Sequence, residues 1–195
     1  MRTTLAAGLE RITASRWNYR LGYLTEFLCP VAFGVIGLQR SPSWPAAVAA
    51  VVAGGLTFSF VEYAIHRWLF HVEASGMAHL HHAHHVEPEA PTALPCISSA
   101  LVAVVVWPFA RRLGEPGVVA FALCGFFAGY FLYSTVHYLE HHVRISRLPS
   151  RSLQRRWAAH AVHHRLPHLN FGVTTSLWDR VFGTYHAQGR RIHGE

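Results

Sequence analysis

Lysine is absent from this 195-residue sequence and acidic residues are scarce, since 17 basic residues, all of them arginine, stand against 10 aspartates and glutamates. Charged residues make up only 14% of the chain and apolar residues 51%, whereas a soluble domain carries about 25% charged residues. This lack of charge excludes an ordinary water-soluble surface and points to lipid as the solvent. The arginines crowd the two ends of the chain and form no stripe with interleaved aromatics, which argues against a nucleic-acid partner.

Cysteine is also rare, and several catalytic motifs are missing. Cys29, Cys96 and Cys124 lie in apolar runs without CxxC spacing, so we expect buried packing residues and no disulfide framework. The N-terminus lacks an apolar core followed by a small-residue cleavage site, so no cleaved signal peptide is expected. There is no G-x-S-x-G, P-loop or G-x-G-x-x-G motif, which leaves no nucleophile elbow or nucleotide-binding loop.

Four apolar stretches approach the roughly 20 residues that a helix needs to cross about 30 Å of hydrocarbon. They cover residues 21–38, 45–65, 93–110 and 117–137. The first and third are short and interrupted, and either is compatible with a re-entrant or tilted element. The sequence therefore predicts an all-α integral membrane protein with four transmembrane helices, forming a single domain over residues 1–195. Gly54 with Gly55, and Gly125 with Gly129, favour close helix contacts.

Arginine bias orients this bundle, because basic residues accumulate on the cytoplasmic side. Residues 1–20 carry four arginines and the tail after residue 143 carries nine, whereas the two turns placed outside hold Arg40, Arg111 and Arg112. Both termini are therefore predicted to be cytoplasmic, which requires an even number of crossings. The second and fourth spans then run inward, so residues 71–92 and 138–195 form a helical cap on the cytoplasmic face.

Histidine is the outlier, with 16 copies, of which ten fall in patterned clusters. The clusters are His66 with His71, an HxxHH motif at His81, His84 and His85, an HxxxH motif at His137 and His141, and a second HxxHH motif at His160, His163 and His164. Residues three or four apart share a helix face, so the first two histidines of each motif are predicted to direct their imidazoles to one metal. His66 and His71 are separated by about 140° on an ideal helix, so they either bind different metals or straddle a helix end.

Ten imidazoles exceed the roughly four to six ligands that one first-row metal accepts, so two metals are implied. A shell of neutral nitrogens suits iron, zinc, copper or nickel. So many titratable groups beside a bilayer are costly unless something binds them. Of the six other histidines, His142 directly follows the HxxxH motif. The remaining five are interpreted as ordinary polar residues; these are His79, His82, His168, His186 and His193.

Three acidic residues are candidates for supporting the histidines. Glu62 lies one turn before His66 in a predicted span, so its carboxylate either makes a helix–helix hydrogen bond or accepts one from a ligand imidazole. Glu140 and Asp179 have the same two interpretations.

Five segments occur together in a recognisable order. They are EYAIHRWLFH (62–71), HHAHH (81–85), YSTVHYLEHH (133–142), HAVHH (160–164) and NFGVTTSLWD (170–179). Together they resemble the fatty acid hydroxylase and sterol desaturase superfamily, closest to its fatty acid 2-hydroxylase branch, over about residues 55–185.

The resemblance implies a di-metal centre at the cytoplasmic ends of the four spans, with two iron ions for activity, zinc possible in isolated protein, and an acyl chain entering between helices. Carried over residue by residue, the ligands would be His66, His71, His81, His84, His85, His137, His141, His160, His163 and His164. Glu62, Asp179 and Asn170 would support them. Two departures are visible: the interval between His71 and His81 is shorter than in eukaryotic 2-hydroxylases, and no cytochrome b5 domain precedes the spans. Electrons are therefore expected from a separate cytochrome b5-, ferredoxin- or reductase-type donor.

The predicted function is hydroxylation of a lipid acyl chain with dioxygen as co-substrate. An unactivated C–H bond is not attacked by acid, base or nucleophile, so a redox metal is expected to do the chemistry while the protein positions the lipid. One alternative is hydroxylation or desaturation of a carotenoid or sterol ring by the same centre. Another is a metal transporter or buffer, which predicts ionisable residues along a path through the spans, where only Glu26 and Glu62 occur.

Overall fold

The computed structural model describes residues 11–72, 76–90 and 94–187. Over these ranges the regular structure is helical and contains no strand. The chain divides into two compact units, which we call the first unit (residues 1–58 and 90–134) and the second unit (residues 59–89 and 135–195). Helices α3 (Trp44–Ile65) and α6 (Pro116–His142) both begin in the first unit and end in the second.

Within these described ranges, three helical stretches are long and apolar enough to cross a membrane: α2 (Arg16–Arg40), α3 continued by the π-helical turn η1 (His66–Phe70), and α6. They have 25, 27 and 27 residues, and at about 1.5 Å per residue each exceeds the 30 Å of a hydrocarbon core. Leu24, Val52 and Leu132 on these helices expose 50%, 56% and 51% of their surface. Such exposed apolar side chains are suited to lipid, and the predicted spans at 21–38, 45–65 and 117–137 are confirmed as helices, each longer than predicted.

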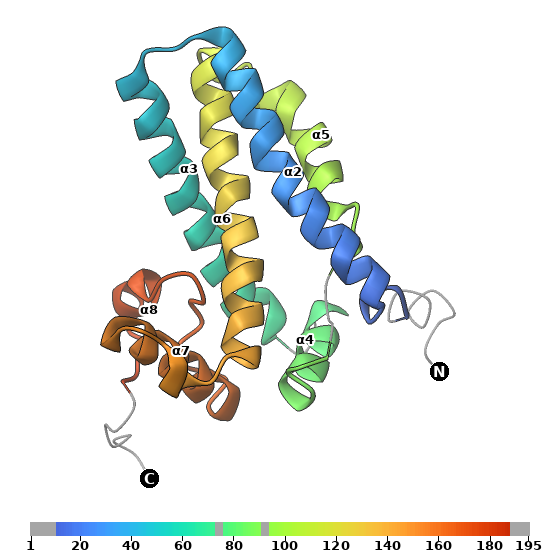
Figure 1. Cartoon of the computed structure of the whole chain (residues 1–195), viewed down its shortest axis with the longest axis vertical. Coiled ribbons are helices and arrows are strands. Elements are labelled where there is room, and N and C mark those ends of the chain that lie inside the picture. Colours follow the sequence, from blue (N-terminus) through green and yellow to red (C-terminus); the bar gives the residue numbers. More distant parts are fainter. Residues whose placement is uncertain (1–10, 73–75, 91–93, 188–195) are drawn as a thin grey trace. The chain divides into compact units, whose positions relative to one another are not determined.

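The predicted third span is a shorter helix than residues 93–110 suggest. Helix α5 (Ser98–Ala110) has 13 residues and is therefore about 20 Å long. It lies beside α2 in the first unit (Figure 1). A fourth full-length transmembrane helix is therefore not found in the part of the chain that the structure describes.

A non-helical segment, residues 94–97, precedes α5 and is fixed to α2 by side chains. The Asn18 amide donates to the carbonyl oxygen of Leu94 (3.0 Å) and accepts from the backbone N–H of Cys96 (2.7 Å). The Thr25 hydroxyl donates to the carbonyl oxygen of Cys96 (2.6 Å). Backbone groups outside a helix need such partners wherever water is excluded. Side chains of α2 therefore provide hydrogen-bond partners for the backbone of residues 94–97.

Glycines set the closest contact in the first unit, between α3 and α6. A Cβ atom at Gly54 would lie 1.9 Å from the carbonyl oxygen of Ala122, and one at Gly125 would lie 2.0 Å from that of Val51. The two backbones thus touch directly, as small residues allow in membrane helices. The predicted contact role of these glycines is confirmed, although Gly55 makes only an ordinary approach, 3.8 Å from the oxygen of Gly125.

The cysteines are free thiols that pack inside the first unit. Cys29 is buried in a small core with Phe33, Ala120 and Phe127. Cys96 and Cys124 are only half-buried, so the expectation of full burial holds for Cys29 alone.

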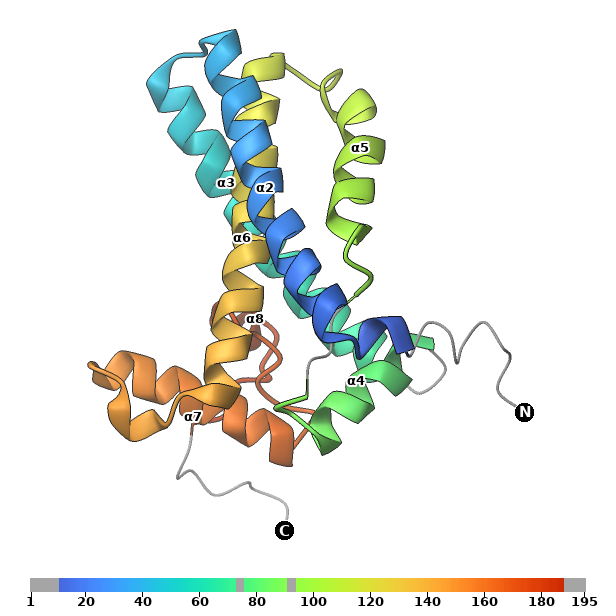
Figure 2. The same ribbon diagram turned by 45° about the vertical axis from the view of Figure 1, so that its right-hand side comes forward.

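The second unit gathers four short helices around the C-terminal ends of α3 and α6. They are α4 (Gly76–Val86), the 3₁₀ turn η2 (Ile145–Arg147), α7 (Arg151–Arg165) and α8 (Leu177–Val181), and Figure 2 shows α4, α7 and α8 around these ends. Its most deeply buried side chains include His163 and Asp179. Polar groups therefore occupy an interior that apolar side chains would fill in an ordinary core.

Replacing Gly125 with alanine is expected to destabilise the first unit, because the added methyl group would meet the backbone of Val51. Overpacking of this kind costs about 1–3 kcal/mol, which corresponds to a fall in Tm of about 3–10 °C for a chain of this size. Thermal unfolding of the detergent-solubilised protein measures the effect. Gly55→Ala is the matched control and is expected to stay within about 2 °C of the parent; equal melting of both variants would contradict a direct helix contact at Gly125.

Candidate metal centre

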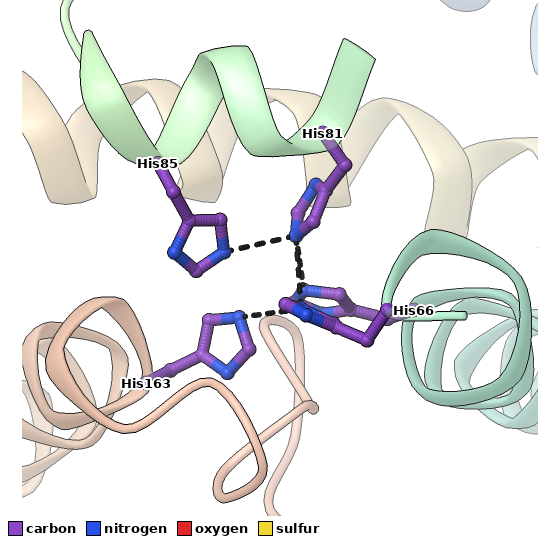
Figure 3. A group of neighbouring side chains, drawn as sticks. His66, His81, His85 and His163 are labelled. Atoms are coloured by element: carbon purple, nitrogen blue, oxygen red, sulfur yellow. Dashed lines mark hydrogen bonds between the residues drawn. The ribbon is translucent and has the colours of Figure 1, made fainter. Parts of the chain in front are cut away.

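The ten patterned histidines lie in two groups of five within the second unit. The first group contains His66, His71, His81, His85 and His163, and the second contains His84, His137, His141, His160 and His164. Within each group the candidate ligand nitrogens all lie within 4.8 Å of one another. Figure 3 shows four members of the first group, from η1, α4 and α7, with their rings directed toward one another. Each group is therefore assembled from three separate parts of the chain.

Each HxxHH motif divides its histidines between the groups. In α4, His81 and His85 belong to the first group and His84 to the second; in α7, His160 and His164 belong to the second and His163 to the first. Residues four apart are separated by about 40° around a helix, whereas adjacent residues are about 100° apart and residues three apart about 60°. The prediction that the first two histidines of each motif share a metal was therefore wrong for both HxxHH motifs, whereas the His137 and His141 pair does share a group.

A π-helical turn brings His66 and His71 together. On an ideal α-helix they would point about 140° apart, but η1 begins at His66 and ends directly before His71. A π-turn is widened to i→i+5 hydrogen bonds, which brings residues five apart closer to one face. Their ring centroids lie 5.2 Å apart. The sequence left open whether the two histidines bind different metals or straddle a helix end, and the structure has them at a helix end and in one group.

The Nε2 atoms of the first group face one another, and two of them are bare. His66 Nδ1 donates to the carbonyl oxygen of Phe171 (2.5 Å) and His163 Nδ1 to that of Leu169 (2.8 Å). Because a carbonyl oxygen can only accept, both neutral rings carry their proton on Nδ1 and leave Nε2 bare. His66 Nε2 lies 3.0 Å from His81 Nε2, and His163 Nε2 lies 3.2 Å from His71 Nε2. Converging nitrogens of this kind form a donor set that fits a cation between them.

The second group shows the same feature through nitrogens that lack a partner. His84 Nε2 and His164 Nε2 are buried and make no hydrogen bond, which is costly for a polar atom unless an ion binds it. His160 Nε2 lies 3.0 Å from His141 Nε2. On its other side, His160 Nδ1 faces the Glu140 carboxylate at 3.5 Å. An all-imidazole set with an orienting carboxylate suits a transition metal.

Burial lowers the pKa of these imidazoles, and neighbouring histidines lower it further. The pKa falls to about 4 for His71 and to about 3 for His84 and His164. The pKa of His163 is also lowered, by burial first and then by the adjacent His66. Such groups are neutral at pH 7, and only a neutral imidazole offers a lone pair to a metal ion.

Residues 169–174, which we call the orienting loop, supply the two carbonyl oxygens that hold His66 and His163. The Asp179 carboxylate fixes this loop by accepting from the backbone N–H groups of Phe171 (2.8 Å) and Gly172 (2.9 Å). The Thr184 hydroxyl also donates to Asp179 (2.7 Å). Asp179 is 1% exposed, so it acts as a buried anchor whose effect reaches the imidazoles through the backbone.

Glu62 and Arg156 hold the far end of the orienting loop. Glu62 accepts from the N–H groups of Val173 (2.6 Å) and Thr174 (3.0 Å), and from the Thr174 hydroxyl. Arg156 donates to the carbonyl oxygens of Thr174 (2.5 Å) and Val173 (2.6 Å). The backbone N–H groups and carbonyl oxygens of Val173 and Thr174 are thereby all hydrogen-bonded to the side chains of Glu62 and Arg156.

Asn170 holds the middle of the orienting loop in an unusual conformation. Its φ of 52° lies in the left-handed region, which asparagine tolerates better than most residues. Its amide donates to the carbonyl oxygens of Ala159 (3.1 Å) and His186 (2.9 Å) and accepts from the His186 N–H (2.8 Å). The turn at Asn170 places the Leu169 and Phe171 carbonyls on either side of it.

The sequence-based candidates for supporting residues thus act in different ways. Glu62, Asp179 and Asn170 hold the backbone of the orienting loop, whereas Glu140 faces the His160 imidazole directly. Arg156 and the two backbone carbonyls were missed. The NFG run at residues 170–172, separated from the second HxxHH motif by five residues, was the available signal for a tight turn near the ligands.

The other histidines do not join the groups where the structure describes them. His142 stacks on Tyr138 with ring centroids 4.0 Å apart, and its Nδ1 donates to the Tyr138 carbonyl oxygen. His79, His82, His168 and His186 belong to neither group. His193 lies outside the described residues.

Comparison with known proteins places this arrangement in a family. The family model described as fatty acid hydroxylase matches residues 51–184, which run through both units. The dihydroceramide fatty acyl 2-hydroxylase FAH2 of Arabidopsis thaliana is 32% identical over 165 residues, covering 80% of this chain and 69% of the relative. The fatty acid 2-hydroxylase of Mus musculus is 32% identical over 148 residues, covering 70% of this chain but 39% of the relative.

A solved structure has a similar fold. The hydroxylase domain of scs7p superposes with a TM-score of 0.73 at 24% sequence identity, over 89% of this chain and 69% of that one. At this identity the likeness shows the fold, while the sequence matches carry the relationship. Because the family model covers more than half of the sequence and the expected motifs lie inside it, the chain belongs to the fatty acid hydroxylase family.

Proposed function

We propose that this chain is a membrane-embedded hydroxylase that adds oxygen to carbon 2 of a lipid acyl chain. The observation that carries the proposal is the convergence of ten imidazoles into two groups of five, in a chain whose described residues include three long apolar helices. The relatives support the reaction and its position, since those of Arabidopsis thaliana and Mus musculus are named as 2-hydroxylases of fatty acyl chains. They favour an acyl chain over a carotenoid or sterol ring as the substrate.

The two groups of histidines would each hold one metal ion, which we propose to be iron for activity. When bound, the irons would supply the redox chemistry that activates dioxygen toward a C–H bond. One oxygen atom enters the C–H bond and the other leaves as water, so each turnover consumes two electrons and two protons. The chain itself keeps the ligand nitrogens unprotonated by burial, and orients them through the orienting loop and Glu140.

We propose that α5 and residues 94–97 together make the fourth crossing, and that the chain forms one domain. Helix α5 alone covers roughly 20 Å of a core of about 30 Å, and residues 94–97, which form a turn, extend it at its N-terminal end. The bonds from Asn18 and Thr25 support this, because they satisfy the backbone of residues 94–97 without water. With four crossings, the arginine distribution predicts that both termini and the metal centre are cytoplasmic.

Electrons are proposed to come from a separate donor protein. The chain has no G-x-G-x-x-G motif to bind a nicotinamide or flavin nucleotide. A cytochrome b5-, ferredoxin- or reductase-type protein would therefore deliver the two electrons one or two at a time.

Replacing a ligand in either group is expected to remove one metal and abolish the product. Protein reconstituted anaerobically with Fe²⁺ is expected to bind about two irons per chain, against about one for His163→Ala in the first group or His164→Ala in the second. Lipid analysis of expressing cells should find 2-hydroxy acyl lipids with the parent and none above background with either variant. His168→Ala is the control, because His168 is exposed and belongs to neither group. Full product from His163→Ala would refute the ligand assignment.

Replacing Asp179 with asparagine is expected to weaken metal binding without removing a ligand. Asparagine has one neutral acceptor oxygen and one NH2 donor, so one of the two N–H groups of Phe171 and Gly172 loses its acceptor and the orienting loop relaxes. Loss of such support typically lowers metal affinity about 10–100-fold. Competition with a chelator measures the affinity, and exposed Glu89→Gln is the control. Unchanged affinity in Asp179→Asn would show that the loop does not position His66 and His163.

A further inference from the structure

The second unit carries a run of exposed positive charge that the metal centre does not use. Arg144, Arg147, Arg151 and Arg155 are all exposed and fall within twelve residues, which we call the basic segment (residues 144–155). No acidic residue occurs between residues 141 and 178, a stretch that contains six arginines. The turn η2 and the helix α7, which carry the basic segment, pack against each other. The positive charge is therefore concentrated on adjoining elements with no compensating acid in that stretch.

Helix α7 joins this charge to the metal centre. Arg151 and His160 are nine residues apart, as are Arg155 and His164, which corresponds to two and a half turns at 100° per residue. The arginines therefore lie on the opposite side of the helix from the two histidines. Along the axis, Arg155 and His160 are separated by only about 7.5 Å. A protein that rests on the arginines would be separated from the second group of histidines by a single helix, about 10 Å in diameter.

We infer that the basic segment is the docking surface for an acidic one-electron carrier protein. The inference rests on the proposed function, in which each turnover requires two electrons from outside the chain. Two successive encounters then deliver them: each time the carrier is oxidised by one electron and the centre is reduced by one. Opposite charges speed such encounters and set the orientation of the partner, and weak transient contacts are typical of electron-transfer pairs.

A lipid surface is the other polyanion that arginines attract. The electron-carrier interpretation is favoured because the exposed arginines continue directly into the helix that carries three of the ten histidines, His160, His163 and His164. Arginines that only attached the protein to a membrane would not need to lie on the same helix as metal ligands.

The test uses the full-length, iron-loaded protein and an acidic soluble ferredoxin kept reduced by its reductase. Arg151→Glu with Arg155→Glu is expected to raise the KM for ferredoxin about tenfold or more, and its dissociation constant by a similar factor, with little change in kcat. The rate of the parent should fall as salt rises from about 0.01 M to 0.15 M, because the Debye length shortens from about 30 Å to 8 Å. The control is Arg111→Glu with Arg112→Glu, two exposed arginines of the first unit, which should leave the KM unchanged.

A chemical reductant separates the two proposals. With dithionite in place of ferredoxin, a single turnover should give the same product yield from the parent and from the basic-segment variant, and both should bind two irons. If the parent forms no product with dithionite, the proposed function fails and the docking surface falls with it. If product forms but the KM and the dissociation constant for ferredoxin do not change in the variant, the docking surface is overturned. A variant that only loses binding to phosphatidylglycerol vesicles would assign the basic segment to lipid and also overturn it.

Discussion

The second unit is organised around imidazole nitrogens that converge on one another. His66 and His163 donate their only ring proton to backbone carbonyls, so their Nε2 atoms can only accept from the Nε2 atoms of His81 and His71, at 3.0 and 3.2 Å. His84 and His164 carry buried nitrogens with no hydrogen bond at all. Burying such polar atoms without a partner would lower the free energy of unfolding by several kcal/mol in total. A bound cation would remove this penalty, because it coordinates the nitrogens. The interior of the second unit is therefore suited to metal coordination more than to apolar packing.

The two groups of histidines are supported by different chemistry. The first is oriented by neutral carbonyl oxygens of the orienting loop. The charged side chains of Glu62, Arg156 and Asp179 bind the backbone of that loop and act on the imidazoles through it. The second has the Glu140 carboxylate within 3.5 Å of His160. A carboxylate next to an imidazole raises the basicity of the ligand more than a carbonyl does. Two metals bound here would therefore have unequal surroundings although each has five imidazoles.

The first unit contributes rigidity of another kind. Direct backbone contact at Gly54 and Gly125 locks α3 to α6, and both of these helices continue into the second unit, where they end in His66 and in His137 with His141. Lipid exerts no hydrophobic force between helices, so such close van der Waals contacts stabilise the pair. This contact holds together the parts of α3 and α6 that lie in the first unit.

The sequence by itself determined the ten histidines, three of the spans, the glycine contact and the family, because each depends on residue type and local spacing. Tertiary structure decided the rest. Helical periodicity allowed His81 to pair with either His84 or His85, and only the position of α4 against its neighbours selected His85 and sent His84 to the other group. The π-turn that unites His66 with His71 has no signature in residue spacing. Likewise, Asp179 and Glu62 reach the imidazoles through a backbone loop distant in sequence from Glu62, and a hydrogen bond to a main-chain carbonyl leaves no mark on the identity of the residue that provides it.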